Sequence, residues 1–252
     1  MTGPQTPLTV ECFGDPGGAH GPFVITCEHA SNNVAGYASG ASDERLLKQH
    51  WGWDIGALAI AKNICQTLDC VGVATLFSRL LLDVNRSLDS NTLIVERCGL
   101  EEVGFNQDLD DAQRAWRIKA FHTQYHDTVS NVIRQRLQRG PVHLLSIHSF
   151  TPTYDGDART MEVGVLFDKH ADLAADLARA LSAEGFTTAL NEPYSGLGGE
   201  LMYSANRHGE AHGIPYLELE IRQDLISTPA EIVSVAHRIT RALRVFFPKS
   251  YA

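Results

Sequence analysis

The stretch Phe23-Val24-Ile25-Thr26-Cys27-Glu28-His29 decides the fold. Its first five residues are apolar or β-branched without a break, which predicts a strand buried on both faces of a sheet. Polar residues then begin abruptly at Glu28 and His29. Strands covered on both faces are typical of α/β domains, and in such sheets ligands bind at the carboxyl ends of the strands. The polar residues after this strand are therefore the first candidates for a functional site.

The rest of the chain alternates between predicted strands and predicted helices. This alternation predicts an α/β fold with a central, mostly parallel or mixed sheet flanked by helices on both faces. We find no repeat and no linker-like segment, so residues 1–252 are expected to form one domain, with 1–21 as an irregular N-terminal arm. Strands are expected at 71–77, 80–82, 142–147, 161–167, 187–190 and 216–221, and helices at 54–68, 110–138, 170–183 and 229–247.

Composition disfavours several kinds of partner and site. The formal net charge is −9 and no cluster of lysines and arginines stands out, so nucleic acid and anionic membranes are poor partners. No basic and apolar leader opens the sequence and no apolar stretch has transmembrane length, which makes a cytoplasmic location the expectation. The five cysteines contain no CxxC pair, which disfavours disulfides and a thiolate zinc site.

His29 and His148 are the natural pair of metal ligands. Both stand at the ends of predicted strands, and imidazole is the commonest protein ligand of zinc. Asp54, which opens a predicted helix among apolar neighbours, is the first choice for a third ligand. Glu28 is the alternative, although adjacent residues of an extended chain point to opposite sides. Asn32 is weaker because its amide is neutral. Since histidines at strand ends are often structural, the ligand set stays open.

The predicted strand at 216–221 carries acidic residues in its interior. Glu218, Glu220 and Arg222 alternate along it, so they share one face of the strand. An acidic side chain in an otherwise apolar strand costs free energy unless it is paired or used in chemistry. We therefore single out Glu220 as a general base, with Glu218 as the second candidate. Arg222 could simply neutralise Glu220.

Arg86 is the best candidate for binding a substrate carboxylate, because guanidinium can bind a carboxylate through two hydrogen bonds. Asn85 could add another hydrogen bond. The alternative for Arg86 is a salt bridge with Asp83. Arg159 is a candidate for a second carboxylate, or only a loop residue. The glycine-rich stretch at 196–199 indicates a flexible loop that could cover a site.

Several short motifs together resemble the N-formylglutamate amidohydrolase family. They occur in the family's order and cover about residues 23–225, so they are far more specific together than singly. They are Cys27-Glu28-His29-Ala30-Ser31-Asn32, Ser78-Arg79 with Asp83-Val84-Asn85-Arg86, Ser146-Ile147-His148-Ser149-Phe150-Thr151-Pro152, Asn191-Glu192-Pro193-Tyr194-Ser195 and Glu220-Ile221-Arg222-Gln223-Asp224.

The resemblance implies a phosphorylase/hydrolase-like fold similar to zinc carboxypeptidases, with a zinc ion at the strand ends. It implies hydrolysis of N-formyl-L-glutamate to formate and L-glutamate, a step in one route of histidine breakdown. On this basis His29 and His148 match the metal-binding histidines and Glu220 the catalytic glutamate. The pair Asn85-Arg86 resembles the Asn-Arg pair that holds a substrate carboxylate in zinc carboxypeptidases.

The resemblance leaves three matters open. Zinc carboxypeptidases have a glutamate three residues after the first histidine, where this chain has Asn32, so Asp54 remains the expected third ligand. The substrate could be another amide, such as a γ-glutamyl or peptide bond. A non-catalytic binding relative is disfavoured because His29, His148 and Glu220 are all present. Cobalt, iron or manganese would suit the same ligands as zinc, and the oligomeric state is not indicated.

Overall fold

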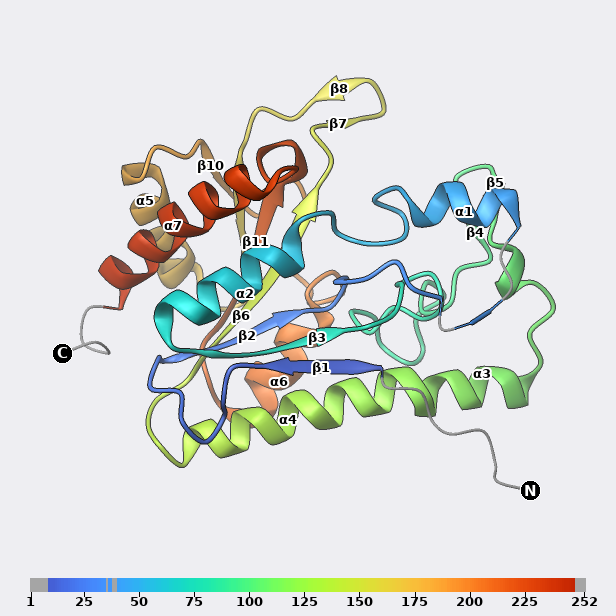
Figure 1. Ribbon diagram of the computed structural model, residues 1–252, viewed down its shortest axis with the longest axis horizontal. Coiled ribbons are helices and arrows are strands. Elements are labelled where there is room, and N and C mark those ends of the chain that lie inside the picture. Colours follow the sequence, from blue (N-terminus) through green and yellow to red (C-terminus); the bar gives the residue numbers. More distant parts are fainter. Residues whose placement is uncertain (1–8, 35, 38–39, 248–252) are drawn as a thin grey trace.

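The apolar run at 23–27 forms strand β2 (Phe23–Cys27), which is buried along its whole length as expected. Figure 1 shows its place in the computed structural model, which describes residues 9–34, 36–37 and 40–247. A seven-stranded sheet has the order β1-β3-β2-β6-β11-β9-β10. The neighbours of β2 are β3 (Val71–Thr75) and β6 (His143–Phe150), and both run parallel to it.

The sheet is mixed in direction. Strand β11 (Tyr216–Arg222) runs parallel to β6 but antiparallel to β9 (Val163–Leu166), which in turn pairs in parallel with β10 (Thr188–Leu190). The predicted α/β fold with a mostly parallel or mixed sheet is confirmed. The expectation of an irregular arm over 1–21 is wrong in part, because β1 (Val10–Phe13) lies antiparallel along β3. The free edge of β3 supplies its hydrogen-bond partners, which local composition does not reveal.

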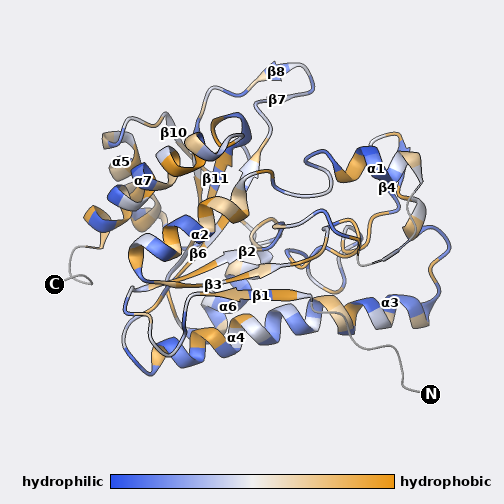
Figure 2. Cartoon of the chain, viewed as in Figure 1, coloured by the Kyte–Doolittle hydropathy of each residue, from blue (hydrophilic) through white to orange (hydrophobic). Residues whose placement is uncertain are grey.

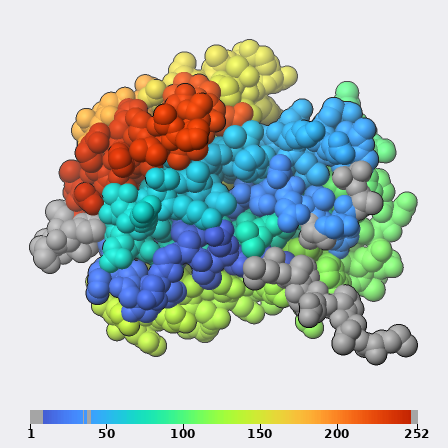
Figure 3. Space-filling view, in the orientation of Figure 1, coloured from blue at the N-terminus to red at the C-terminus, as the bar shows by residue number. Residues whose placement is uncertain are grey.

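Helices cover both faces of the sheet (Figure 1). Helices α2 (Ala57–Leu68), α5 (Ala171–Ala183) and α7 (Pro229–Phe246) lie on one face, and α2 and α7 pack side by side on the surface seen in Figure 3. Helices α4 (Gln124–Leu137) and α6 (Tyr203–His212) lie on the other. The helices mix hydrophilic and hydrophobic residues, while the central strands are mainly hydrophobic (Figure 2).

Alternate residues of β2 enter two separate hydrophobic cores, and this explains the unbroken apolar run. Phe23, Ile25 and Cys27 pack under the α2 side, and Val24 packs under the α4 side. Side chains of a strand alternate between faces, so a strand covered on both sides is expected to be apolar or β-branched along its length. Burial of the Cys27 side chain raises the pKa of its thiol well above the usual value, which fits a packing role.

The long helix expected at 110–138 is present in three parts: α3 (Asp111–Arg117), a π-helical turn (Ile118–Thr123) and α4. It begins at Asp110, whose carboxylate accepts a hydrogen bond from the Gln113 backbone N–H. The π-helical turn carries no sequence signal that we identified. Helix α7 begins in a similar way, with Thr228 and Glu231 capping its first turn.

Some elements differ from the sequence-based expectation. Residues 80–82 lie in turn and irregular backbone instead of a strand, although their leucines are buried: Leu81 and Leu82 in the core under the α4 side, and Leu80 in a smaller core beside it. Helix α6 and two small hairpins were not expected: β4 (Arg97–Cys98) with β5 (Glu101–Glu102), and β7 (Thr153–Tyr154) with β8 (Asp157–Ala158). The remaining elements are helix α1 (Ala41–Leu47) and 3₁₀ turns at Gly104–Asn106 and Gln223–Leu225. None of the helices within the described ranges is both long and apolar enough to span a membrane.

Candidate functional site

The sheet register brings the predicted site residues together at one edge. Strands β2, β6 and β11 are parallel neighbours, so their carboxyl ends meet. His29 follows β2 by two residues, and His148 lies near the end of β6. Glu220 of β11 is the direct register partner of His148. Asp54 comes from the loop before α2, where its backbone N–H donates a 2.9 Å hydrogen bond to the His29 carbonyl.

His29, Asp54 and His148 form a compact, buried group of three potential ligands. The Nδ1 atoms of His29 and His148 are 3.1 Å apart. The Asp54 Oδ2 atom lies 2.8 Å from Nδ1 of His148 and 3.4 Å from Nδ1 of His29. Two ligand atoms on a tetrahedral zinc, each about 2.0–2.1 Å from the ion, are separated by about 3.3 Å. The three spacings therefore suit one small cation.

A carboxylate lies behind each histidine and fixes its tautomer. Asp83 Oδ1 is 2.7 Å from Nε2 of His29, and Glu28 Oε2 is 3.1 Å from Nε2 of His148. Carboxylates only accept hydrogen bonds, so in each neutral ring Nε2 carries the proton and Nδ1 carries the lone pair. Two imidazole lone pairs and a carboxylate oxygen thus converge on one point. Such an arrangement needs a proton or a metal ion between the three atoms.

Electrostatics keep the Asp54 carboxylate ionised. Burial opposes ionisation, but Arg79, His29 and His148 outweigh it and hold the Asp54 pKa well below its usual range. Arg79 forms an ion pair with Asp54. Burial also disfavours charge on His148, yet the carboxylates of Glu218, Asp54 and Glu28 raise its pKa well above the ordinary value.

The other two candidates for the third ligand lie elsewhere. Glu28 points to the opposite side of the chain from His29, where it accepts hydrogen bonds from Tyr125 (2.8 Å) and Ser146 (2.6 Å). Burial opposes ionisation of Glu28, but the interaction with His148 and the hydrogen bond from Ser146 outweigh it and lower the Glu28 pKa. Asn32 is exposed and donates to the carbonyl of Leu47. Glu28 thus supports a histidine from behind, and Asn32 is remote from the group.

Glu218 and Glu220 are buried beside His148 and form with it a second compact group. One carboxylate oxygen of each, Oε2, has no hydrogen-bond partner among the described residues. Burial raises the Glu220 pKa well above its usual value, and Asp54 and Glu218 add to the effect. Burial likewise raises the Glu218 pKa, to about 7. Arg222 does not neutralise Glu220: it pairs with Asp224 and donates to the carbonyls of residues 159–161, because the strand ends there.

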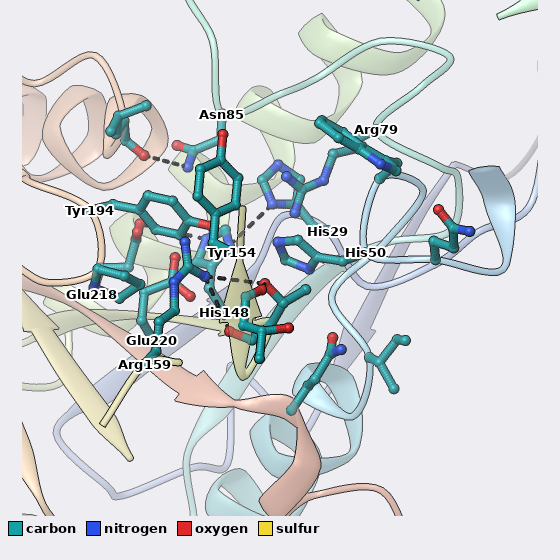
Figure 4. Close-up of a pocket in the computed structure, with 18 of the residues that line it drawn as sticks. His29, His50, Arg79, Asn85, His148, Tyr154, Arg159, Tyr194, Glu218 and Glu220 are labelled. Carbon is teal, nitrogen blue, oxygen red and sulfur yellow. Dashed lines mark hydrogen bonds and ion pairs between the residues drawn. The ribbon is translucent and has the colours of Figure 1, made fainter. Parts of the chain in front are cut away.

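These groups line the floor of a cleft of about 1000 Å³. Figure 4 shows His50 and Arg79 on one side of it and Tyr194, Arg159 and Glu220 on the other, with His148 between them. The cleft is lined by His29, Lys48, Gln49, His50, Trp51, Ile55, Arg79, Asn85, Arg86, His148, Thr151, Thr153, Tyr154, Asp155, Arg159, Pro193, Tyr194, Leu201, Glu218, Glu220 and Gln223.

The predicted carboxylate-binding residues reach this cleft in different ways. Arg86 lines it with one nitrogen bonded to Thr92 and one to the Asn85 carbonyl. The guanidinium carbon of Arg159 lies 5.1–5.5 Å from the centroids of three aromatic rings, which belong to Phe150, Tyr154 and Tyr194. Asn85 differs from the expectation, because its amide is engaged by the backbone of Leu201 (2.9 Å) and Ser204 (2.9 Å). It ties the start of α6 to the site.

Sequence reasoning did not assign roles to Arg79, His50, Tyr194 or Asp83, all of which lie at or next to the site. Arg79, Asp83 and Tyr194 belong to family motifs quoted above, and this membership was the available signal for them. His50 precedes Asp54 by four residues, and its Nδ1 atom lies 3.4 Å from Oδ1 of Asp54. A separation of four residues places two side chains on one face only where the segment is helical. The segment is a turn, so periodicity carries no information there.

Two histidines of the long helix hold the segment that carries Asp83, Asn85 and Arg86. His126 Nε2 lies 3.1 Å from the Val84 carbonyl, and His122 Nε2 lies 3.1 Å from the Arg86 carbonyl. A carbonyl can only accept, so each Nε2 donates. Nδ1 of neutral His126 must then accept, and the donor is His208 Nε2, 2.9 Å away on α6. This row of imidazoles positions the segment from behind.

Comparison with known proteins gives the family. The family model described as N-formylglutamate amidohydrolase matches residues 21–227. The crystal structure of gene product Atu2144 from Agrobacterium tumefaciens is 29% identical, with a TM-score of 0.87 over 97% of this chain and 96% of that one. The N-formylglutamate amidohydrolase from Ralstonia eutropha JMP134 has a TM-score of 0.75 at 20% identity, over 94% and 97% of the two chains. A search of curated proteins returns no match.

The match spans most of the chain and includes every segment that supplies the converging histidines, carboxylates and arginines. The similarity to the Ralstonia protein adds agreement in fold. The chain belongs to the N-formylglutamate amidohydrolase family, and is a hydrolase of amide bonds.

Proposed function

We propose that this enzyme hydrolyses N-formyl-L-glutamate, or a similar N-acyl acidic amino acid, to the free acid and the amino acid. One divalent metal ion, zinc in the first instance, would be held by His29, Asp54 and His148. The observation that carries the proposal is the convergence of two Nδ1 lone pairs and one carboxylate oxygen on a single buried point. With N-formyl-L-glutamate as substrate, the reaction releases formate, as in one route of histidine breakdown.

The residues present fit a zinc ion. The donor set of two imidazoles and one carboxylate is common at catalytic zinc sites, and a carboxylate behind each histidine orients the ring and strengthens it as a ligand. A zinc ion at such a site polarises the amide carbonyl and lowers the pKa of a water molecule. The adjoining cleft leaves access for that water and for a substrate.

Glu220 is the proposed general base. It is buried, one of its oxygens has no hydrogen-bond partner among the described residues, and burial raises its pKa, which makes it a stronger proton acceptor than an ordinary carboxylate. It takes a proton from the attacking water and delivers it to the leaving nitrogen. As the C–N bond breaks, the water oxygen remains on the acyl carbon and the amine departs. Its place beside His148 in the sheet register supports this role.

Three arginines line the cleft and suit a substrate with two carboxylates. Arg86 and Arg159 are the proposed carboxylate-binding residues, each free to turn at least one N–H toward the cleft. Arg79 remains paired with Asp54, but its Nε has no partner among the residues the structure describes. It is available to donate to the carbonyl oxygen as negative charge develops there.

The test measures zinc content and formate release from N-formyl-L-glutamate together. We expect about one zinc per wild-type chain and release of formate, and loss of both in His148→Ala. The matched control is His143→Ala, which changes a histidine at the opposite end of the same strand, away from the cleft. A protein that binds zinc but releases no formate would refute the formyl substrate. One that neither binds zinc nor acts after zinc is added would favour a binding role instead.

A further inference from the structure

The cleft is larger than a formyl group requires. Its volume of about 1000 Å³ stands at the upper end of the range of about 300–1,000 Å³ that accommodates drug-sized ligands. N-formyl-L-glutamate is a much smaller molecule. The extra space therefore raises the question of which half of the substrate, acyl or amine, would fill it.

The proposed chemistry orients the substrate across the cleft. Glu220 delivers a proton to the leaving nitrogen, so the amine half must lie on the Glu220 side. Arg159 and Tyr194 share that side (Figure 4), and Arg159 can bind a carboxylate of the amine half there. The acyl half must then extend away from Glu220, toward the side that carries His50 and Arg79.

The acyl side is built by the segment before α2. Lys48, Gln49, His50 and Trp51 all line the cleft there. The Trp51 side chain is 46% exposed although it lies in a pocket wall. An indole offers a large flat apolar surface. Covering it with another flat or apolar group removes that surface from water and so favours binding. A formyl group, with only a hydrogen on its carbonyl carbon, extends nothing toward this wall.

We infer that the preferred substrate of this enzyme has an acyl group larger than formyl, with an aromatic or other flat apolar portion that packs on Trp51. The inference rests on the proposed function, since it uses the same metal site, general base and arginines. The reaction is unchanged: water adds to the acyl carbon, the C–N bond breaks, and an aromatic carboxylic acid leaves in place of formate. No reactant besides water is needed.

The test is a series of N-acyl-L-glutamates at equal zinc content, with formyl, acetyl, butanoyl and benzoyl as the acyl groups. We expect kcat/KM to be higher for N-benzoyl- than for N-formyl-L-glutamate. In Trp51→Ala the ratio of these two values should fall about tenfold, because the indole surface is lost. Trp51→Phe should restore most of the ratio. Trp116→Ala is the matched control: Trp116 is similarly exposed, at 40%, but lies outside the cleft, so the ratio should not change.

The outcomes separate this inference from the proposed function. Hydrolysis of the formyl substrate with a much slower benzoyl reaction would overturn the inference and leave the proposed function standing. So would a ratio that does not change in Trp51→Ala. Rapid hydrolysis of the benzoyl substrate alone would support the inference and replace formyl as the substrate. If zinc-loaded enzyme cleaves no member of the series, both the proposed function and the inference fail.

Discussion

The Nδ1 atoms of His29 and His148 face each other 3.1 Å apart, although 119 residues separate them along the chain. Neither ring could adopt this position alone, because each is oriented by its own carboxylate, Asp83 for His29 and Glu28 for His148. The carboxylates therefore determine where the two lone pairs point. This relationship distinguishes residues that would bind the metal directly from residues that hold the ligands.

Asp54→Asn and Asp83→Asn should differ in metal affinity. Asp54→Asn replaces a proposed ligand with a neutral amide and should abolish stoichiometric zinc binding. Asp83→Asn leaves all three ligands but removes the carboxylate behind His29, so affinity should fall about 10–100-fold. Zinc retention against a competing chelator measures both. Asp89→Asn, in an exposed position nearby, is the control. Equal retention by the first variant and the wild type would remove Asp54 from the ligand set.

Glu220→Gln should reduce kcat by about 10²–10⁴-fold while zinc content stays near that of the wild type, because the amide cannot accept the proton of the attacking water. Single-turnover kinetics with metal analysis of the same sample measures this. Glu192→Gln, an exposed position outside the cleft lining, is the control and should keep full activity. If Glu220→Gln loses zinc and saturating zinc restores kcat to near the wild-type value, the residue is a ligand and not the base.

Arg86→Ala should raise KM strongly with little change in kcat. The reason is that Arg86 is proposed to bind the substrate carboxylate equally well in the ground state and in the transition state. Arg86→Lys should recover only part of the loss, since an ammonium group cannot form the paired hydrogen bonds of guanidinium. Arg159→Ala should behave in the same way. The exposed Arg207, which lies on α6 outside the cleft, provides the control Arg207→Ala. Wild-type KM in Arg86→Ala would exclude it from the substrate site.

Metal removal should lower thermal stability, because the ligands come from three separate parts of the chain and the unfolded chain does not hold them together. At a free zinc concentration a hundredfold above Kd, binding stabilises the fold by about 2.7 kcal/mol. For a chain of this size that corresponds to a Tm decrease of roughly 5–10 °C on chelation. Calorimetry with and without chelator measures it. The same chelator should leave the Tm of His148→Ala unchanged.

Two buried histidines, His126 and His208, should each contribute a loss of stability as the pH drops below about 6.5. Burial lowers the pKa of His126 to about 2 and that of His208 to about 3, so both are neutral in the folded protein. In the unfolded chain each takes up a proton near pH 6.5, which favours unfolding as the pH falls. Between pH 7 and pH 5.5 each histidine should cost about 1 kcal/mol. Urea unfolding at the two pH values measures the loss.

His126→Gln provides the comparison for that experiment. Glutamine can still donate to the Val84 carbonyl but does not titrate. The free energy of unfolding of the variant should therefore decrease by about 1 kcal/mol less than that of the wild type over the same pH range. A pH dependence identical to that of the wild type would show that His126 is not buried and neutral.

The sequence predicted the fold class, and it predicted which candidate residues lie together at one edge of the sheet, because the relevant signal is local. The apolar run of β2 and the alternation of acidic and apolar residues in β11 can be recognised from consecutive residues. Because ligands bind at the carboxyl ends of strands in α/β sheets, these strands then indicate where a site is expected. The grouping of His29, Asp54 and His148 agrees with the expectation. Their role as metal ligands is still a prediction, as is that of Glu220 as base.

Other features could not be predicted because they depend on contacts between distant segments. The pairing of Glu28 with Tyr125 and that of Asn85 with the start of α6 join residues about 100 positions apart, and neither leaves a local pattern. Strand β1 forms because β3 has a free edge. The leucines of 80–82 look like a strand but lie in turn and irregular backbone, since an apolar run reports burial and not backbone conformation.

The place of β11 in the sheet has a consequence for biosynthesis. This strand is the last of the seven to be made, yet it inserts between β6 and β9, both of which precede it in the chain. A ribosome-bound chain that has not yet exposed residues 216–222 already contains His29, Asp54 and His148, but it lacks Glu218 and Glu220, which line the cleft. If Glu220 acts as proposed, hydrolytic activity can arise only after residues 216–222 have been synthesised and β11 has closed the gap between β6 and β9.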